Sequence, residues 1–90
     1  MRKLSRRQLG ALMMPWGADT GKALPVYAVG SFYLSGKTYP ERAMVLRAIN
    51  AIEDDIPLAK RGMHGWTKRD VKDLEQISRC LHNFLEADYG

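Results

Sequence analysis

Residues 67–86, with the sequence TKRDVKDLEQISRCLHNFLE, form the stretch that decides the fold. At about 100° per residue, the apolar side chains fall on one half of a helix surface, which predicts a long amphipathic helix with that half buried. Thr67 suits the N-cap, and Asp70 completes a capping box in place of the more usual Glu or Gln. The side chains expected to face the core are Val71, Leu74, Ile77, Cys80, Leu81, Phe84 and Leu85.

The opposite face of this helix carries a row of polar side chains with no acid inside it. Successive members are three or four residues apart, so they lie along one side of the helix. Arginine, lysine, glutamine and asparagine are residue types that contact phosphates and base edges in nucleic acids. We call Arg69, Lys72, Gln76, Arg79 and Asn83 the polar stripe.

Two shorter helices are expected before residue 36. Ser5 and Gln8 form a capping box, and Pro15 pushes the residue before it out of helical geometry, so a helix is predicted over 5–13. Residues 24–35 are assigned as a second helix, although their valines and aromatic residues also suit a short β element.

A further helix is expected over 39–55. Thr38 or Tyr39 caps its start, and Pro57 ends it because proline has no backbone N–H to donate. The residues at 57–66 then form a basic connecting loop. The complete expectation is an all-α compact bundle of three to four helices (5–13, 24–35, 39–55 and 67–86) in a single domain over 1–90.

The composition restricts the class of protein. Ninety residues allow one domain and disfavour an elaborate enzyme, while a hydrophobic content of 46% is enough for a core. The net charge of +4 favours acidic partners, nucleic acid first among them. A single cysteine excludes an internal disulfide, and no apolar run approaches the roughly 18 residues of a membrane span. We therefore expect a cytoplasmic protein that does not bind membranes.

Two patterns that suggest catalysis or metal binding fail on inspection. Residues 31–38 approach the phosphate-binding loop Gly-x-x-x-x-Gly-Lys-Ser/Thr, but Ser31 stands where the first glycine belongs. Cys80 and His82 are two apart on a helix, so their side chains diverge by about 160° and cannot share an ion. We expect a protein that is not an enzyme, with no catalytic residues, cofactor or metal.

The first hypothesis is a small non-catalytic protein that binds DNA or RNA. The polar stripe contacts the nucleic acid while basic segments on either side hold the phosphate backbone. The connection at 57–66 is longer than the three- or four-residue turn of a helix-turn-helix unit, so that motif is not expected. The binding residues assigned are Arg6, Arg7, Lys60, Arg61, Trp66, Lys68, Arg69, Lys72, Gln76, Arg79 and Asn83.

The alternative is a protein–protein interaction factor that inhibits or adapts a larger protein complex, such as a host machine that handles nucleic acid. Exposed Trp16, Tyr33, Met63 or Trp66 would anchor such a partner, because large side chains dominate interface energetics. A short, motif-poor chain of uneven charge is typical of the accessory proteins of mobile elements. Association into a homo-oligomer is also open.

Overall fold

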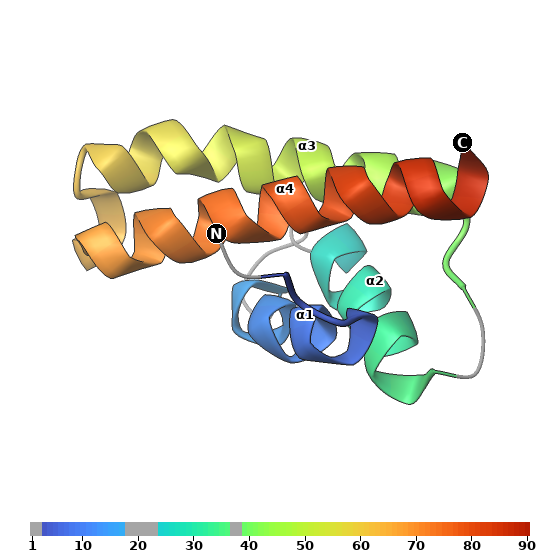
Figure 1. The fold of residues 1–90 in the computed structure, drawn as a ribbon. Coiled ribbons are helices and arrows are strands. Elements are labelled where there is room, and N and C mark those ends of the chain that lie inside the picture. Colours follow the sequence, from blue (N-terminus) through green and yellow to red (C-terminus); the bar gives the residue numbers. More distant parts are fainter. Residues whose placement is uncertain (1–2, 18–23, 37–38) are drawn as a thin grey trace.

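Four α-helices and two short 3-10 helices make up the computed structural model, which describes residues 3–17, 24–36 and 39–90. The segments are α1 (Arg6–Met13), η1 (Met14–Gly17), α2 (Leu24–Ser35), α3 (Arg42–Lys60), η3 (Met63–Gly65) and α4 (Lys68–Tyr89). The long helices α3 and α4 lie antiparallel, and α1 and α2 pack together on one side of them (Figure 1). The predicted all-α bundle is confirmed, with residues 24–35 as helix rather than strand. Within these residues, no helix has the length and apolar content needed to cross a membrane.

The inward face of α4 lies at the centre of the core. Leu74, Ile77 and Leu81 have no exposed surface, and Cys80 is 7% exposed. The predicted buried face is therefore confirmed at these four residues, whereas Val71, Phe84 and Leu85, also predicted to face the core, are half-buried. The other helices contribute the remaining buried apolar residues, which are Leu9, Met13, Val26, Val29, Tyr33, Val45, Ala48, Ile49, Ile52 and Ala59.

Both predicted capping boxes are present. At the start of α4, the Thr67 N–H donates to the Asp70 carboxylate at 2.7 Å, and the Asp70 N–H donates to the Thr67 hydroxyl at 3.4 Å. At the start of α1, the Ser5 N–H donates to the Gln8 side-chain oxygen at 2.9 Å, and the Gln8 N–H donates to the Ser5 hydroxyl at 3.1 Å. These bonds satisfy backbone donors that have no partner within the helix. Helix α4 ends at Tyr89, later than predicted.

Helices α1 and α2 approach each other through glycines. A Cβ atom added to Gly10 would lie 2.7 Å from the carbonyl oxygen of Gly30 and 3.0 Å from the backbone nitrogen of Leu34. Real Cβ atoms essentially never come that close to backbone atoms. The absence of a side chain at Gly10 is therefore what allows the two helices to pack at this distance.

The start of α3 differs from the prediction. Glu41 is the N-cap residue, in extended geometry and without a side-chain hydrogen bond, and the helix begins at Arg42 rather than near residue 39. Tyr39, one of the two residues expected at the cap, is 64% exposed in the segment before the helix. Thr38, the other one, lies outside the described residues.

The predicted end of α3 is wrong, because Pro57 lies inside the helix instead of ending it. Proline in this position removes the N–H that would donate to the Glu53 carbonyl. Both residues are exposed, so water can satisfy that carbonyl. Continuing the helix to Lys60 keeps Ala59, which is 3% exposed, in the core. The connection between the long helices is therefore shorter than the predicted loop over 57–66.

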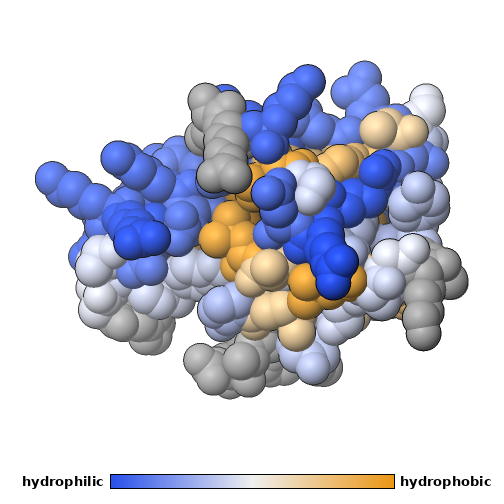
Figure 2. Space-filling view, turned by 60° about the horizontal axis from the view of Figure 1, so that its bottom comes forward, coloured by the Kyte–Doolittle hydropathy of each residue, from blue (hydrophilic) through white to orange (hydrophobic). Residues whose placement is uncertain are grey.

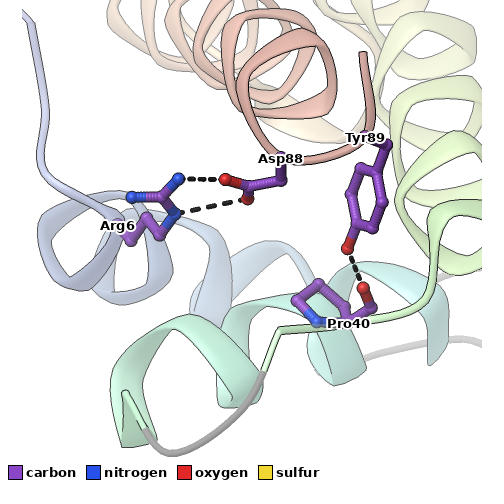
Figure 3. Close-up of polar contacts among 4 residues, drawn as sticks. All are labelled: Arg6, Pro40, Asp88 and Tyr89. Carbon is purple, nitrogen blue, oxygen red and sulfur yellow. Dashed lines mark hydrogen bonds and ion pairs between the residues drawn. The ribbon is translucent and has the colours of Figure 1, made fainter.

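Two polar contacts hold the last turn of α4 against the rest of the bundle (Figure 3). The Arg6 guanidinium donates to the Asp88 carboxylate through two of its nitrogens, Nε and Nη2. The distance from Nε to Oδ2 is 3.3 Å. The Tyr89 hydroxyl donates to the backbone carbonyl of Pro40. The start of α1, the segment before α3 and the end of α4 are therefore fastened together.

Arg6 is also enclosed by aromatic rings. Its guanidinium carbon lies 4.6 Å from the ring centroid of Phe84 and 5.0 Å from that of Tyr39, which are cation–π distances. The Asp88 side chain is only 7% exposed, and its hydrogen bond raises the pKa of Arg6. A positive charge in the first turn of a helix is unfavourable in itself, and Asp88 offsets that cost within the molecule.

Tyr33 is 3% exposed, and among the described residues its hydroxyl has no hydrogen-bond partner. A buried hydroxyl without a partner costs stability, so Tyr33→Phe is expected to leave the free energy of unfolding unchanged or raise it by about 1 kcal/mol. Burial also raises the pKa of Tyr33 above its ordinary value of 10.0. Chemical denaturation of both proteins at neutral pH measures the first effect.

The same variant tests the effect of pH. In the unfolded chain Tyr33 ionises near its ordinary pKa of 10.0, whereas in the folded protein it stays protonated to higher pH. Ionisation then favours the unfolded state, so stability is constant below that pKa and falls as the pH rises through and above it. The fall in the free energy of unfolding from pH 9 to pH 11 is expected to be smaller in Tyr33→Phe than in the unmodified protein. An equal fall in both proteins would contradict burial of this hydroxyl.

Candidate nucleic-acid interface

The connection between α3 and α4 turns sharply because of two glycines. Gly62 follows α3 with φ at 71°, and Gly65 ends η3 with φ at 73°. A residue with a Cβ is strained at such left-handed angles, so glycine is the residue that suits both positions. Trp66 then returns to extended geometry, and Thr67 starts α4. These turns bring the end of α3 beside the first turns of α4.

A hollow of about 570 Å³ lies between the end of α3 and the beginning of α4. Four of the residues that line it are basic, three are apolar, and one is acidic. We call it the basic hollow. Its lining consists of Ala59, Lys60, Arg61, Gly62, Trp66, Thr67, Lys68, Val71, Lys72 and Glu75.

The four cations of the basic hollow are Lys60, Arg61, Lys68 and Lys72, and all of them are exposed. The charged group of each forms no ion pair or hydrogen bond with a side chain that the structure describes. Their charges are therefore available to an anion. Figure 2 shows the molecule from the side on which α1 and α2 lie. The end with the α3–α4 connection, at the left, is hydrophilic, whereas apolar atoms gather near the centre.

Trp66 connects the basic hollow to the body of the protein. It is half-buried, and its ring meets that of Trp16 edge to face, with centroids 5.5 Å apart and planes at 76°. Such aromatic pairs add to the stability gained from burial alone. The contact fixes the indole of Trp66 in place, so the apolar part of the hollow is ready before any ligand arrives.

The polar stripe lies on the outer side of α4, as its periodicity predicts. Arg69, Lys72, Arg79 and Asn83 are exposed, and Gln76 is half-buried. Only Lys72 also lines the basic hollow. Arg79 lies two helical turns further along, about 10 Å from Lys72 along the axis. The stripe and the hollow are thus adjoining surfaces that share one residue.

The two arginines assigned to binding in α1 have different surroundings. Arg6 donates to Asp88 and packs against aromatic rings, so its charge is already neutralised inside the protein. Arg7 is exposed. A role for Arg6 in contacting phosphates is therefore not supported by its geometry, whereas Arg7 stays available.

Most of the large side chains expected to anchor a protein partner pack within the protein itself. Tyr33 is buried and packs edge to face against Phe84, with ring centroids 5.7 Å apart. Trp16 and Trp66 are half-buried and contact each other. Met63, at 45% exposure, is the one of the four that presents a large free surface.

Five lining residues of the basic hollow are not among the predicted binding residues: Ala59, Gly62, Thr67, Val71 and Glu75. Val71 was assigned to the core but is half-buried, and Glu75 was not assigned to any site. A signal for Val71 and Glu75 exists in the spacing, because they lie three and seven residues after Lys68. Such residues share one side of a helix, so the face toward the end of α3 can be read from Lys68 onward.

Among the residues that the structure describes, no three His, Cys, Asp or Glu side chains come close enough together to hold a metal ion. In comparisons with known proteins, the chain matches no family model, no curated protein and no solved structure. The fold and the site together define a small helical domain with a basic, tryptophan-lined hollow at the turn of its long helical pair.

Proposed function

We propose that this protein is a small non-catalytic factor that binds nucleic acid through the basic hollow and the adjoining polar stripe. The observation that carries the proposal is the convergence of Lys60, Arg61, Lys68 and Lys72 around one hollow beside Trp66. Lysine and arginine that contact phosphates release the counterions held by a nucleic acid, which supplies much of the binding free energy. An aromatic ring among such cations is typical of sites that also stack on bases.

The balance of basic and acidic residues around the start of α4 supports placing the contact at this end. Asp70 is engaged in the capping box with Thr67, so its charge is partly neutralised by backbone and hydroxyl donors. The other end of the helix carries Glu86 and the paired Asp88. Lys60, Arg61, Lys68, Arg69 and Lys72 outnumber Asp70, Asp73 and Glu75 around the α3–α4 connection, which favours a polyanion at this end rather than at the chain end.

A protein partner is the second candidate, and it has less support. Of the four large side chains expected to anchor one, only Met63 is substantially exposed. Tyr27 and Tyr39 are also exposed, at 47% and 64%, but they lie in other segments than Met63, whereas an interface buries a cluster of anchors together. The cations around the basic hollow favour a phosphate-bearing partner over a generic protein surface.

The salt dependence of binding tests the proposal. Fluorescence anisotropy with a labelled single-stranded oligonucleotide is expected to give a linear fall of log K with log salt concentration. The double variant Lys68→Gln with Lys72→Gln removes two phosphate contacts and should reduce the slope by about 1.4 for a single strand. Binding that is absent, or that does not respond to salt, would contradict the proposal.

The matched control is Arg42→Gln with Arg47→Gln. Both arginines are exposed on α3, at the end of the long pair opposite the connection, so this variant loses the same net charge. Its slope is expected to equal that of the unmodified protein. Equal losses in the two double variants would mean that net charge alone attracts the oligonucleotide, and the basic hollow would not be the site.

A further inference from the structure

The lining of the basic hollow divides into an apolar inner part and a charged outer part. Ala59 is 3% exposed, and Val71 and Trp66 are half-buried, whereas the lysines and Arg61 are exposed. A phosphate would be bound by the outer cations alone, because contact with an apolar surface does not stabilise it. A planar aromatic group matches that inner surface, because it buries apolar area and stacks on an indole.

The carboxylate of Glu75 also indicates that the hollow binds more than phosphate. Glu75 is half-buried and lines the basic hollow, and among the described residues its carboxylate makes no hydrogen bond or ion pair. A carboxylate repels phosphate, so it is out of place in a site that binds phosphate only. It is, however, a good acceptor for the amino group of a nucleobase, as in the contacts that acidic residues make with the N4 amino group of cytosine.

The size of the basic hollow fits one such group. The hollow is open to solvent, and its volume of about 570 Å³ leaves room for one base together with its neighbouring phosphates. In a duplex the bases are stacked inside the helix, and extruding one costs a few kcal/mol. A single strand presents its bases without that cost.

We infer that the ligand of the basic hollow is single-stranded nucleic acid, with one unpaired base seated against Trp66 and Val71, its amino group donating to Glu75. Phosphates on either side of that base contact Lys60, Arg61, Lys68 and Lys72. This inference rests on the proposed function and narrows it to unpaired, amino-bearing bases. Cytosine and adenine carry such an amino group, and thymine and uracil do not.

The test compares three labelled ligands of equal length: an oligo(dC) strand, a fully abasic strand with the same phosphates, and an oligo(dC)·oligo(dG) duplex. Stacking on an aromatic side chain is worth enough that oligo(dC) is expected to bind about 10- to 100-fold more tightly than the abasic strand. Equal affinity for all three would overturn the inference and leave the proposed function standing. Binding to none of them would overturn both.

A fluorescence measurement locates the base. Trp16 and Trp66 are the two tryptophans of the chain, so in Trp16→Phe all indole emission comes from Trp66. That emission is expected to fall when oligo(dC) binds and to stay constant with the abasic strand. A constant emission with both strands, at concentrations where anisotropy shows binding, would place the base elsewhere.

Glu75→Gln separates base recognition from phosphate attraction. If Glu75 accepts from the base, the unmodified protein prefers oligo(dC) over oligo(dT), and the variant loses most of that preference. If the hollow holds phosphate only, removing the acid strengthens binding of every strand, the abasic one included, and the inference fails. The ratio of the two affinities is the readout, because a general structural defect does not change it.

Discussion

Leu81→Ala is expected to lower the free energy of unfolding by about 2–5 kcal/mol. Leu81 has no exposed surface and lies in the inward face of α4, at the centre of the core. Alanine there loses the transfer free energy of the removed methyl and methylene groups and leaves a cavity. A domain of this size is stable by only about 5–15 kcal/mol, so the loss is a large share of the total. Urea denaturation measures it as a shift of the midpoint at unchanged slope.

Leu85→Ala is the matched control. It makes the same chemical change one helical turn further along α4, at a side chain that is half-buried. Its expected loss is about 1 kcal/mol, because less apolar area returns to water and the site is open enough to leave no closed cavity. Equal losses at the two positions would mean that Leu85 is buried as deeply as Leu81, which contradicts the structure.

Gly10→Ala is expected to destabilise the protein by about 1–3 kcal/mol, although alanine is the better helix former by about 0.5–1 kcal/mol. The added methyl group would lie 2.7 Å from the Gly30 carbonyl oxygen. Because that obstacle is backbone, the contact is relieved only if α1 and α2 move apart, and their packed side chains move with them. The midpoint of thermal unfolding, followed by circular dichroism, is the measurement.

Gly30→Ala gives the comparison at the same helix crossing. Its added methyl group would meet the Met14 sulfur at 3.2 Å and the Gly10 carbonyl oxygen at 3.4 Å. The nearest obstacle is the end of a flexible side chain, which can turn away. This variant is therefore expected to change the free energy of unfolding by no more than about 1 kcal/mol in either direction. If Gly30→Ala destabilised the protein as much as Gly10→Ala, the difference between a backbone obstacle and a flexible side chain would not explain the effects.

Local signals in the sequence were sufficient for most of the helices. Caps such as Ser5 with Gln8 act over three residues, and the apolar period of α4 acts over one or two turns, so both can be recognised without tertiary structure. The error at Pro57 has a tertiary cause. A proline in the last turn loses one hydrogen bond at an exposed carbonyl, and the packing of Ala59 in the core outweighs that local loss.

The candidate site was only partly predictable, for the same reason. Lys60, Arg61, Trp66 and Lys68 are close in sequence, and the short connection keeps them close in space. The sequence predicts Arg6 as a phosphate-binding residue because it does not reveal that Asp88, 82 residues away along the chain, is its partner. Periodicity gives the face on which a side chain lies, but not which distant segment covers it.

The contact between Arg6 and Asp88 also has a consequence for folding during synthesis on the ribosome. The two residues are 82 positions apart, and synthesis at about 5–20 residues per second separates their appearance by about 4–16 s. In the later part of that interval α1 and α2 exist without α4, and Tyr33 lacks the Phe84 ring against which it packs in the finished fold. The nascent chain is therefore expected to attract chaperones that bind apolar segments until α4 has been translated.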